Sequence, residues 1–335
     1  MKYRSLGRTG VKVSPLCLGC MNFGDKTPLA EATRMVEVAL DRGINFLDTA
    51  DIYGRGSSES MVGEILAASG KRDRIVLASK VHGAMDDHDP NAKGNSRRHI
   101  IEGCEASLRR LKTDYLDLYQ IHRPDPATPI DETLRALDDL IRAGKVRYIG
   151  TSTFAAWQIT ESLWTSHELG LNRFICEQPP YHLLDRRIER ELLPMARTYG
   201  IGIIPWSPLA SGFLTGKYQR NTQPPADGRI GHQAHRKAML QNEAAFDVLD
   251  FVTGLADEKN ISVSQFALAW CMSKPGITSP IIGPRTIDQI EDNLKALDVT
   301  LSEEDHARID DMVPPGRATV PYYEVHFGPH SERVF

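Results

Sequence analysis

Eight short apolar segments alternate with helical segments along nearly the whole chain, and this alternation is the feature that most limits the possible folds. The apolar segments cover residues 13–19, 44–49, 75–80, 115–122, 146–152, 173–178, 201–206 and 279–283. Short strands that alternate with helices form parallel βαβ units. Eight such units favour a closed (β/α)8 barrel, the TIM barrel, over an open doubly wound sheet.

Residues with helical periodicity fill the intervals between these segments. In residues 30–41 the apolar side chains recur at helical spacing, which is typical of a helix packed on a sheet. Other helices are expected over residues 58–68, 97–111, 130–143, 155–169, 186–199, 243–259, 263–273, 286–297 and 302–312. Ser302 and Asp305 form a capping box for the last helix, whereas Pro194 weakens the middle of the segment 186–199.

Three segments lie outside the alternation. Residues 2–12 predict an N-terminal β-hairpin that caps the bottom of the barrel, and the polar residues 216–236 predict a mobile loop. Residues 314–335 predict an irregular C-terminal tail. No Pro- or Ser-rich linker divides the chain, so we expect residues 1–335 to form a single domain.

Composition argues against several classes of protein. The 335 residues carry a net charge of −4 and no long basic run, which disfavours a nucleic-acid-binding protein. Five cysteines in a chain of this length do not make a disulfide framework and indicate a reducing compartment. No apolar run is long enough to span a bilayer, and the first residues do not resemble a signal peptide. We therefore expect a cytoplasmic protein without membrane association.

Two short patterns do not predict a functional site. Cys17 and Cys20 match C-x-x-C, but zinc would need a second pair, so both are expected to be buried structural cysteines. A G-x-G-x-x-G motif is missing from the sequence, which disfavours a Rossmann nucleotide site. We predict no metal site.

Four titratable side chains lie at or just after the ends of three consecutive predicted strands. Asp48 ends the second strand and Tyr53 follows it, while Lys80 ends the third strand. His122 ends the fourth. Side chains at the C-terminal strand ends of a barrel converge at one mouth. Alone, each residue has a common structural role as a cap, a surface charge or a core side chain. A shared role explains their common position more simply than four separate roles.

These residue types suit the reduction of a carbonyl group. Hydride transfer to a carbonyl leaves negative charge on the oxygen, which then needs a proton. A phenol titrates near ~10 in water, and an adjacent ammonium favours its ionised form. Tyr53 would supply the proton, Lys80 would be that ammonium, and Asp48 would hold it in place. His122 would donate a hydrogen bond to the carbonyl and position it.

Three stretches resemble the catalytic signatures of the aldo-keto reductases. They are Asp48-Thr49-Ala50-Asp51-Ile52-Tyr53-Gly54, Ser79-Lys80 and Ile121-His122. The similarity covers nearly the whole chain. It implies a (β/α)8 barrel with an N-terminal hairpin and the reversible reduction of aldehydes or ketones by NADPH, without a metal. It also implies a catalytic tetrad of Asp48, Tyr53, Lys80 and His122.

The resemblance further implies a nicotinamide site at the strand ends. Ser152 and Gln178 would hold the carboxamide, and Thr153 replaces the asparagine that the family motif has at this position. Trp206 would stack on the nicotinamide ring, because an aromatic face suits a flat ring. The loop that covers the diphosphate would include Ser207, Leu209, Gly212 and Lys217. Further cofactor positions are Gly19, Met21 and Asp48.

The segment after the last strand resembles the adenosine site of the same family. Its cofactor positions would be Gly283, Arg285, Gln289, Asp292 and Asn293. A helix N-terminus favours anions, and a guanidinium suits phosphate. Arg285 would therefore bind the 2′-phosphate of NADPH, with NADH as a weaker alternative.

The substrate pocket is less determined by the sequence. We expect it to be lined by Phe23, Tyr53, His122, Arg123 and Trp206, together with Asn22. Tyr322, Tyr323 and Phe327 would join them if the tail folds over the mouth. This lining favours carbonyl compounds with apolar or aromatic bodies, although Arg123 could also bind an acid or a phosphate group.

Two other functions remain open. One is a regulatory, cofactor-binding subunit with little turnover, of the kind formed by the β subunits of potassium channels, which resemble members of this family. The other is an isomerase or aldolase in which Lys80 forms a Schiff base. For the favoured reductase, the expected partner is a small-molecule carbonyl substrate. The natural substrate, the direction of the reaction and the choice between monomer and homo-oligomer are left open.

Overall fold

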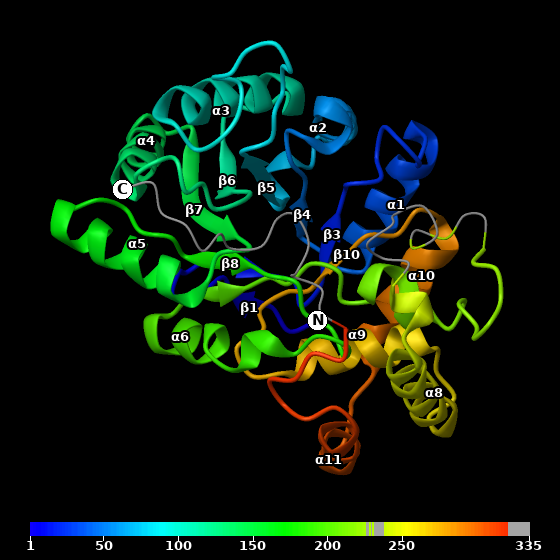
Figure 1. Ribbon diagram of the computed structural model, residues 1–335. Helices are drawn as coiled ribbons and strands as arrows, with labels where there is room; N and C mark the ends of the chain where they lie inside the picture. Colours follow the sequence, from blue (N-terminus) through cyan, green and yellow to red (C-terminus); the bar gives the residue numbers. More distant parts are fainter. Residues whose placement is uncertain (226–227, 229, 231–237, 321–335) are drawn as a thin grey trace.

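Eight parallel strands form one curved sheet at the centre of the molecule, with helices outside it (Figure 1). The computed structural model describes residues 1–225, 228, 230 and 238–320. The strands are β3 Cys17–Gly19, β4 Phe46–Asp48, β5 Val76–Val81, β6 Leu116–Ile121, β7 Val146–Ser152, β8 Cys176–Gln178, β9 Gly202–Ile203 and β10 Ile281–Ile282. They pair in the order β10-β3-β4-β5-β6-β7-β8-β9.

The two ends of this sheet meet, so the sheet closes into a barrel. β10 pairs with β3 through Ile281 and Cys17. Ile203 of β9 forms a parallel bridge with Ile277, and the Ile203 carbonyl accepts the Thr278 amide at 2.7 Å. The predicted (β/α)8 barrel is confirmed. Closure removes the open sheet edges that would otherwise expose unpaired backbone groups.

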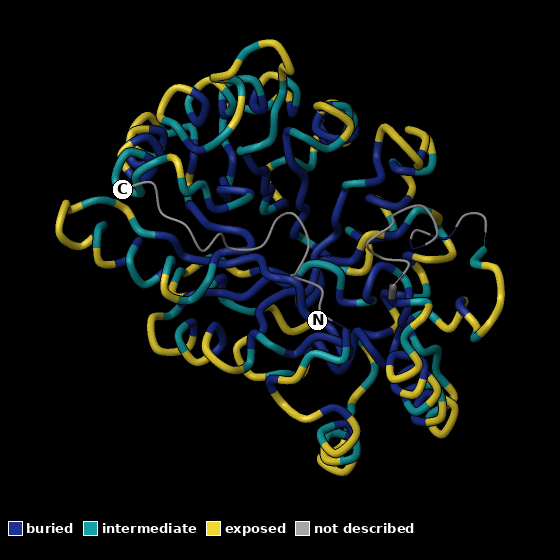
Figure 2. The backbone as a smooth tube through the Cα atoms, in the orientation of Figure 1, coloured by how far each residue is buried: buried dark blue, intermediate teal, exposed yellow. Residues whose placement is uncertain are grey.

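Helices lie outside the sheet, and most of them are buried on the side that faces it and exposed on the other (Figure 2). They are α1 Leu29–Asp41, α2 Ser57–Ser69, α3 Arg97–Leu111, α4 Ile130–Arg142, α5 Ala156–Leu169, α6 Leu192–Tyr199, α8 Glu243–Glu258, α9 Val263–Ser273, α10 Ile287–Lys295 and α11 Glu303–Met312. In α1 the buried residues, Ala32, Met35, Val36 and Ala39, recur at helical spacing, as the periodicity predicts.

The N-terminal hairpin closes the end of the barrel where the strands begin. It consists of β1 Arg4–Ser5 and β2 Lys12–Val13, paired antiparallel. Leu6 and Val13 are fully buried in a cluster with side chains from inside the barrel, including Phe46. Since these apolar side chains fill the interior at this end, we expect ligands to bind at the opposite end of the barrel.

Prolines account for two differences from the predicted elements. The segment 13–19 is divided, because Pro15 has no N–H for a sheet ladder, and only Cys17–Gly19 joins the barrel. The segment 186–199 becomes a short 3-10 turn, η3 Arg187–Glu189, followed by α6. Pro194 lies in the first turn of α6, where a missing N–H costs no helical hydrogen bond.

Other sequence-based boundaries are closer to the structure. The capping box of Ser302 and Asp305 is confirmed, since the Ser302 hydroxyl accepts the Asp305 amide at 3.1 Å. All five cysteines are buried as free thiols, including Cys17 and Cys20. The predicted loop 216–236 and tail 314–335 lie partly outside the described residues.

A buried arginine links the strand-end loop after β8 to the last helix. The Arg186 side chain is 1% exposed, and it pairs with Glu189 at 2.8 Å and with Asp310 of α11 at 2.7 Å. It also donates to the backbone carbonyl of Val313. A buried cation of this kind is tolerated because its guanidinium has carboxylate and carbonyl acceptors around it.

We predict that Arg186→Met lowers the free energy of unfolding by roughly 3–5 kcal/mol, because it leaves the largely buried Glu189 carboxylate without its cation. The matched control is Arg308→Met, which breaks an exposed pair with Glu258 and should cost about 1 kcal/mol or less. Urea unfolding followed by circular dichroism measures both. Equal losses for the two variants would contradict the structural role assigned to Arg186.

Candidate active site

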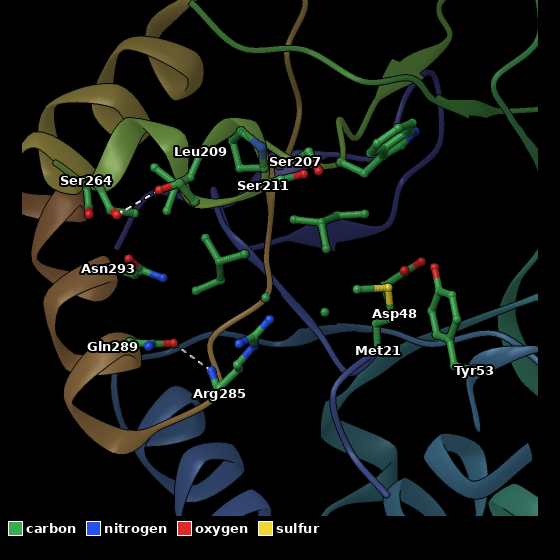
Figure 3. A pocket seen from close by; sticks show the side chains of 18 of the residues that line it. Met21, Asp48, Tyr53, Ser207, Leu209, Ser211, Ser264, Arg285, Gln289 and Asn293 are labelled. Atoms are coloured by element: carbon green, nitrogen blue, oxygen red, sulfur yellow. Dashed lines mark hydrogen bonds between the residues drawn. The ribbon is translucent and has the colours of Figure 1, made fainter. Parts of the chain in front are cut away.

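The C-terminal ends of the strands open into a cavity of about 950 Å³ (Figure 3). Gly19, Asp48, Ser152 and Gln178 are each the last residue of their strand, and all four line it. The cavity extends from Tyr53 to the loop and helix that follow β10. Its volume is typical of sites that bind cofactors or other small molecules.

The residues predicted to contact a cofactor all line this one cavity. They are Gly19, Met21, Asp48, Ser152, Gln178, Trp206, Ser207, Leu209, Gly212, Lys217, Gly283, Arg285, Gln289, Asp292 and Asn293. Tyr53, His122 and Arg123 line it as well. Residues from seven strand ends and a helix therefore meet at one place, although they are far apart in the sequence.

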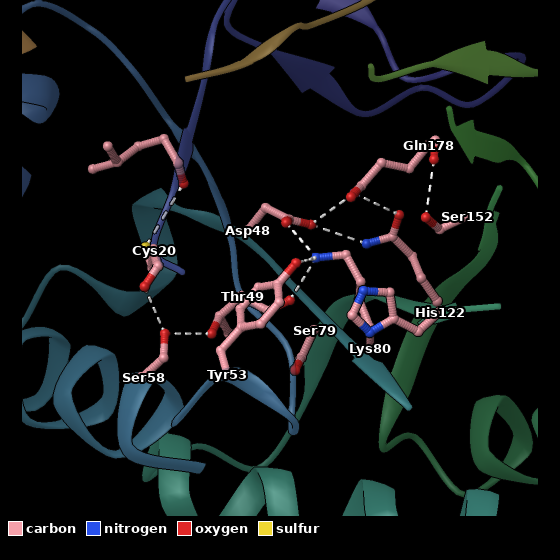
Figure 4. Close-up of polar contacts among 12 residues, drawn as sticks. Cys20, Asp48, Thr49, Tyr53, Ser58, Ser79, Lys80, His122, Ser152 and Gln178 are labelled. Atoms are coloured by element: carbon pink, nitrogen blue, oxygen red, sulfur yellow. Dashed lines mark hydrogen bonds and ion pairs between the residues drawn. The ribbon is translucent and has the colours of Figure 1, made fainter. Parts of the chain in front are cut away.

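Asp48, Lys80 and Tyr53 form a connected polar chain at one end of the cavity (Figure 4). The Lys80 ammonium is completely buried and lies 2.5 Å from Asp48 Oδ1. It donates to the Thr49 carbonyl at 2.9 Å and to the Tyr53 hydroxyl oxygen at 3.3 Å. Because an ammonium can only donate, the phenol oxygen is the acceptor and its own proton is directed elsewhere.

The charge state of Lys80 is set by a competition. Burial lowers the pKa of Lys80, but the nearby Asp48 carboxylate and Tyr53 raise it by more, so its pKa is raised overall. Lys80 therefore stays charged at neutral pH. A cation held at a fixed position beside a phenol favours the state in which the phenol has released its proton.

His122 lies beside Tyr53. The two rings are 5.6 Å apart between centroids and meet edge to face. Burial, followed by the charges of Arg123 and Lys80, holds the pKa of His122 well below its usual range. The imidazole is therefore neutral at neutral pH, with one nitrogen as donor and one as acceptor.

The loop from β4 to α2 positions Tyr53 with unusual backbone angles. Tyr53 starts the 3-10 turn η1 Tyr53–Gly56, in which Gly54, Arg55 and Gly56 have φ values of 56°, 50° and 92°. A Cβ atom at Gly54 would lie 2.0 Å from the Ser57 hydroxyl, so only glycine fits there. The Asp51 amide donates to the Lys80 carbonyl at 3.2 Å and so attaches this loop to β5.

The opposite end of the cavity is formed by α10 and the segment that leads into it. Arg285 precedes the helix, and Gln289 and Asn293 lie on it, across the cavity from Tyr53 (Figure 3). The Gln289 side chain accepts the Arg285 amide at 2.8 Å. Asp292 is held by Ser262 at 2.9 Å and Gln265 at 2.6 Å. This end thus combines a helix N-terminus with a guanidinium, which suits a phosphate group.

A model of the Aldo/keto reductase family matches residues 15–314 of this chain. This chain belongs to the aldo/keto reductase family. Three curated relatives are similar over most of their length. A probable voltage-gated potassium channel subunit beta of Arabidopsis thaliana is 41% identical over 305 residues, which cover 89% of this chain and 92% of that protein.

The other two relatives are named as enzymes. The uncharacterized oxidoreductase YrpG of Bacillus subtilis (strain 168) is 40% identical over 332 residues, which cover 96% of this chain and 99% of that protein. The versiconal hemiacetal acetate reductase of Aspergillus parasiticus is 35% identical over 338 residues, with 94% and 98% covered. Family membership and these names support an oxidoreductase.

Some substrate residues expected in this aldo/keto reductase lie elsewhere. Phe23 is fully buried in the hydrophobic core and is not among the residues that line the cavity. Asn22 is also buried, and its amide donates to the Gly283 carbonyl at 3.1 Å and to the Pro284 carbonyl at 3.3 Å. Tyr322, Tyr323 and Phe327 lie outside the described residues.

Other residues of the site were not predicted from the sequence. Ile52, Pro208, Ser211, Thr215, Ser264, Ile281, Ile282 and Asp288 line the cavity as well. Gln120 of β6 contacts Asp48 from inside the barrel. It lies two residues before His122, so the alternation of side chains along a strand places both on one face. That periodicity was the signal that could have identified Gln120.

Thr153 lies at the turn after β7 and contacts Arg123. Its φ is 62°, and its hydroxyl accepts a hydrogen bond from Arg123 Nη1 at 3.1 Å. The same nitrogen donates to the His122 carbonyl at 2.6 Å. Arg123 therefore joins the ends of β6 and β7.

Among the described residues, no group of three His, Cys, Asp or Glu could hold a metal ion. In the same part of the chain, no helix has the length and apolarity needed to cross a membrane.

Asp51 is a buried acid on the loop that carries Tyr53, and its ionisation can be tested by the pH dependence of stability. Asp51 is completely buried, and one of its oxygens has no hydrogen-bond partner among the described residues. Burial, and then the neighbouring Glu59, raises the pKa of Asp51 to about 7. An unfolded aspartate titrates near ~3.9, so between these two values the native state binds a proton that the unfolded state releases.

We predict that this acid makes the protein less stable as pH rises from about 4 to about 7. In Asp51→Asn that contribution is absent, so the variant gains free energy of unfolding relative to the wild type across this window. Urea titrations at pH 5 and pH 8 measure the difference. Asp114→Asn, at an exposed position, should show no such gain. The same pH dependence in wild type and Asp51→Asn would contradict the prediction.

Proposed function

We propose that this protein is an NADPH-dependent reductase that converts aldehydes or ketones to alcohols, in a reversible reaction. The observation that carries the proposal is the chain from Asp48 through Lys80 to Tyr53, placed beside His122 at the wall of the cavity. Membership of the aldo/keto reductase family and relatives named as oxidoreductases support it.

The residues present fit a nicotinamide dinucleotide. The cavity has one end with a proton-donating group and another end with Arg285 and a helix N-terminus. Lys217 and Gly212, from the segment that follows β9, line the same cavity. We assign the nicotinamide to the end near Gln178 and Trp206, and the adenosine phosphate to Arg285. When bound, NADPH supplies the hydride.

Each member of the tetrad has a role that follows from its contacts. The Tyr53 hydroxyl accepts from Lys80, so its proton is available to the carbonyl oxygen of the substrate. Lys80 stabilises the phenolate that remains, and Asp48 fixes Lys80. The neutral His122 donates an N–H to the same carbonyl oxygen and orients it. Arg123 and Trp206, which line the cavity, would contact the body of the substrate.

We predict that Tyr53→Phe lowers kcat by roughly 10²- to 10⁴-fold, because it removes the proton donor. NADPH binding, measured by quenching of protein fluorescence, should be retained. The assay is NADPH consumption at neutral pH with an aromatic aldehyde. Tyr3→Phe, at an exposed tyrosine of the N-terminal segment, is the matched control and should keep full activity. Wild-type turnover in Tyr53→Phe would overturn the proposal.

We predict that Arg285→Leu raises the KM for NADPH by roughly 10- to 100-fold, because a charge-assisted contact with the 2′-phosphate is lost. The KM for NADH, which has no such phosphate, should change little. Arg308→Leu, on the surface of α11, should affect neither cofactor. An equal rise in the KM for NADPH and for NADH would show that Arg285 does not contact the 2′-phosphate.

A second function is favoured by one specific observation. A relative named as a probable voltage-gated potassium channel subunit beta is 41% identical to this chain. A regulatory subunit of that kind would bind NADPH tightly and show very slow turnover. The aldehyde assay separates the two functions: binding without turnover on any carbonyl compound would favour the regulatory role.

A further inference from the structure

Gln120 lies in the interior of the barrel, directly below the proposed reaction site. It belongs to β6 Leu116–Ile121 and is completely buried. Its neighbour two positions earlier, Leu118, belongs to the apolar cluster inside the barrel. Because side chains alternate along a strand, Gln120 points into the same interior, one step nearer the cavity. A buried amide at such a position is costly unless each of its polar atoms is satisfied.

The Gln120 amide contacts two residues that the proposed reaction uses. Its Nε2 donates to Asp48 Oδ2 at 3.1 Å, while its Oε1 accepts from Gln178 Nε2 at 3.1 Å. Gln178 Nε2 also donates to Asp48 Oδ2, at 3.0 Å. The two Asp48 oxygens are therefore divided: Oδ1 pairs with Lys80, and Oδ2 accepts from the two glutamines (Figure 4).

This arrangement fixes the direction in which Gln178 points. If its amide were reversed, its oxygen would face Asp48 Oδ2 and Gln120 Oε1, which are both acceptors. The Nε2 group must therefore face inward. The Gln178 oxygen is then the atom that remains to accept a hydrogen bond from a ligand in the cavity, which Gln178 lines.

We propose that Gln120 is a positioning residue that couples the cofactor contact at Gln178 to the Asp48–Lys80 ion pair. The inference rests on the proposed function. The Gln120 side-chain amide bonds to Asp48 and to Gln178 at the same time. It presents a donor to Asp48, which keeps that carboxylate oriented toward Lys80. It presents an acceptor to Gln178, which keeps the Gln178 oxygen directed at the carboxamide of a nicotinamide.

Two substitutions separate this role from simple packing. Gln120→Leu keeps a similar volume but removes both the donor and the acceptor. Gln120→Glu keeps the shape, and its effect depends on its protonation. As a neutral acid it can donate to Asp48 and accept from Gln178, whereas as a carboxylate it repels Asp48. A carboxyl buried beside another carboxylate binds its proton more tightly, so this variant should change with pH near neutrality.

The experiment measures the dissociation constant of NADPH by fluorescence quenching, and kcat and KM for an aromatic aldehyde, from pH 5.5 to 8.5. For Gln120→Leu we expect NADPH binding weakened about 10-fold, together with a drop in kcat of at least 10-fold. For Gln120→Glu we expect the activity relative to wild type to be highest at pH 5.5 and to fall at least 10-fold as pH rises. A residue that only packs would not produce this pH dependence.

The matched control is Gln158→Leu. Gln158 is a structural glutamine whose side chain accepts the Ala155 amide at the start of α5, away from the main cavity. It should leave NADPH binding, kcat and the pH profile unchanged. If Gln120→Leu fails to fold, Gln120→Glu, which has the same shape, still decides the matter.

The outcomes distinguish the inference from the proposed function. A wild-type protein that reduces no carbonyl compound would overturn the proposed reductase. A wild-type reductase in which the Gln120 variants behave like Gln158→Leu would overturn only the coupling. A double-mutant cycle adds a second measure: Gln120→Leu and Gln178→Leu should have less than additive effects on NADPH binding if they act as one unit, and additive effects would contradict the coupling.

Discussion

The ion pair between Lys80 and Asp48 is the interaction on which the rest of the site depends. Burying both charges costs several kcal/mol per ion, and the protein can tolerate this only when every donor and acceptor is used. The three protons of Lys80 have three acceptors, namely Asp48, the Thr49 carbonyl and the Tyr53 hydroxyl. Since no donor is left over, the ammonium has one orientation, and the phenol beside it has a fixed position.

The barrel makes this pairing possible by stacking a polar layer on an apolar one. Asp48, Lys80, Gln120 and Gln178 each follow, by two residues, an apolar side chain of the inner cluster: Phe46, Ala78, Leu118 and Cys176. The strand register places Lys80 opposite Gln120 on neighbouring strands. The apolar layer below excludes water, so the electrostatic interactions of the polar layer are stronger than they would be in solution.

The sequence predicted the barrel and the residues around the cavity because strand ends are marked by a change from apolar to polar side chains. It predicted boundaries less well where proline acts locally, as at Pro15 and Pro194, since the effect of proline depends on whether its missing N–H would have been bonded. The sequence could not tell that Phe23 would be buried in the core, because an aromatic residue after a strand can face either the core or the cavity. The spacing of Gln120 from His122 placed it on the inward face of its strand, but its role could not be predicted because its polar partners, Asp48 and Gln178, come from other strands.

The left-handed turn after β4 limits how this protein can change. Gly54, Arg55 and Gly56 all have positive φ, and a side chain at Gly56 would meet Arg110 of α3. An inserted or deleted residue would reverse or rotate this turn and move the phenol away from its lysine. The number of residues between Asp48 and Tyr53 is therefore fixed by this turn. The loops after the other strands carry no such constraint from this turn, so a change in their length would leave the geometry of Tyr53 and Lys80 in place.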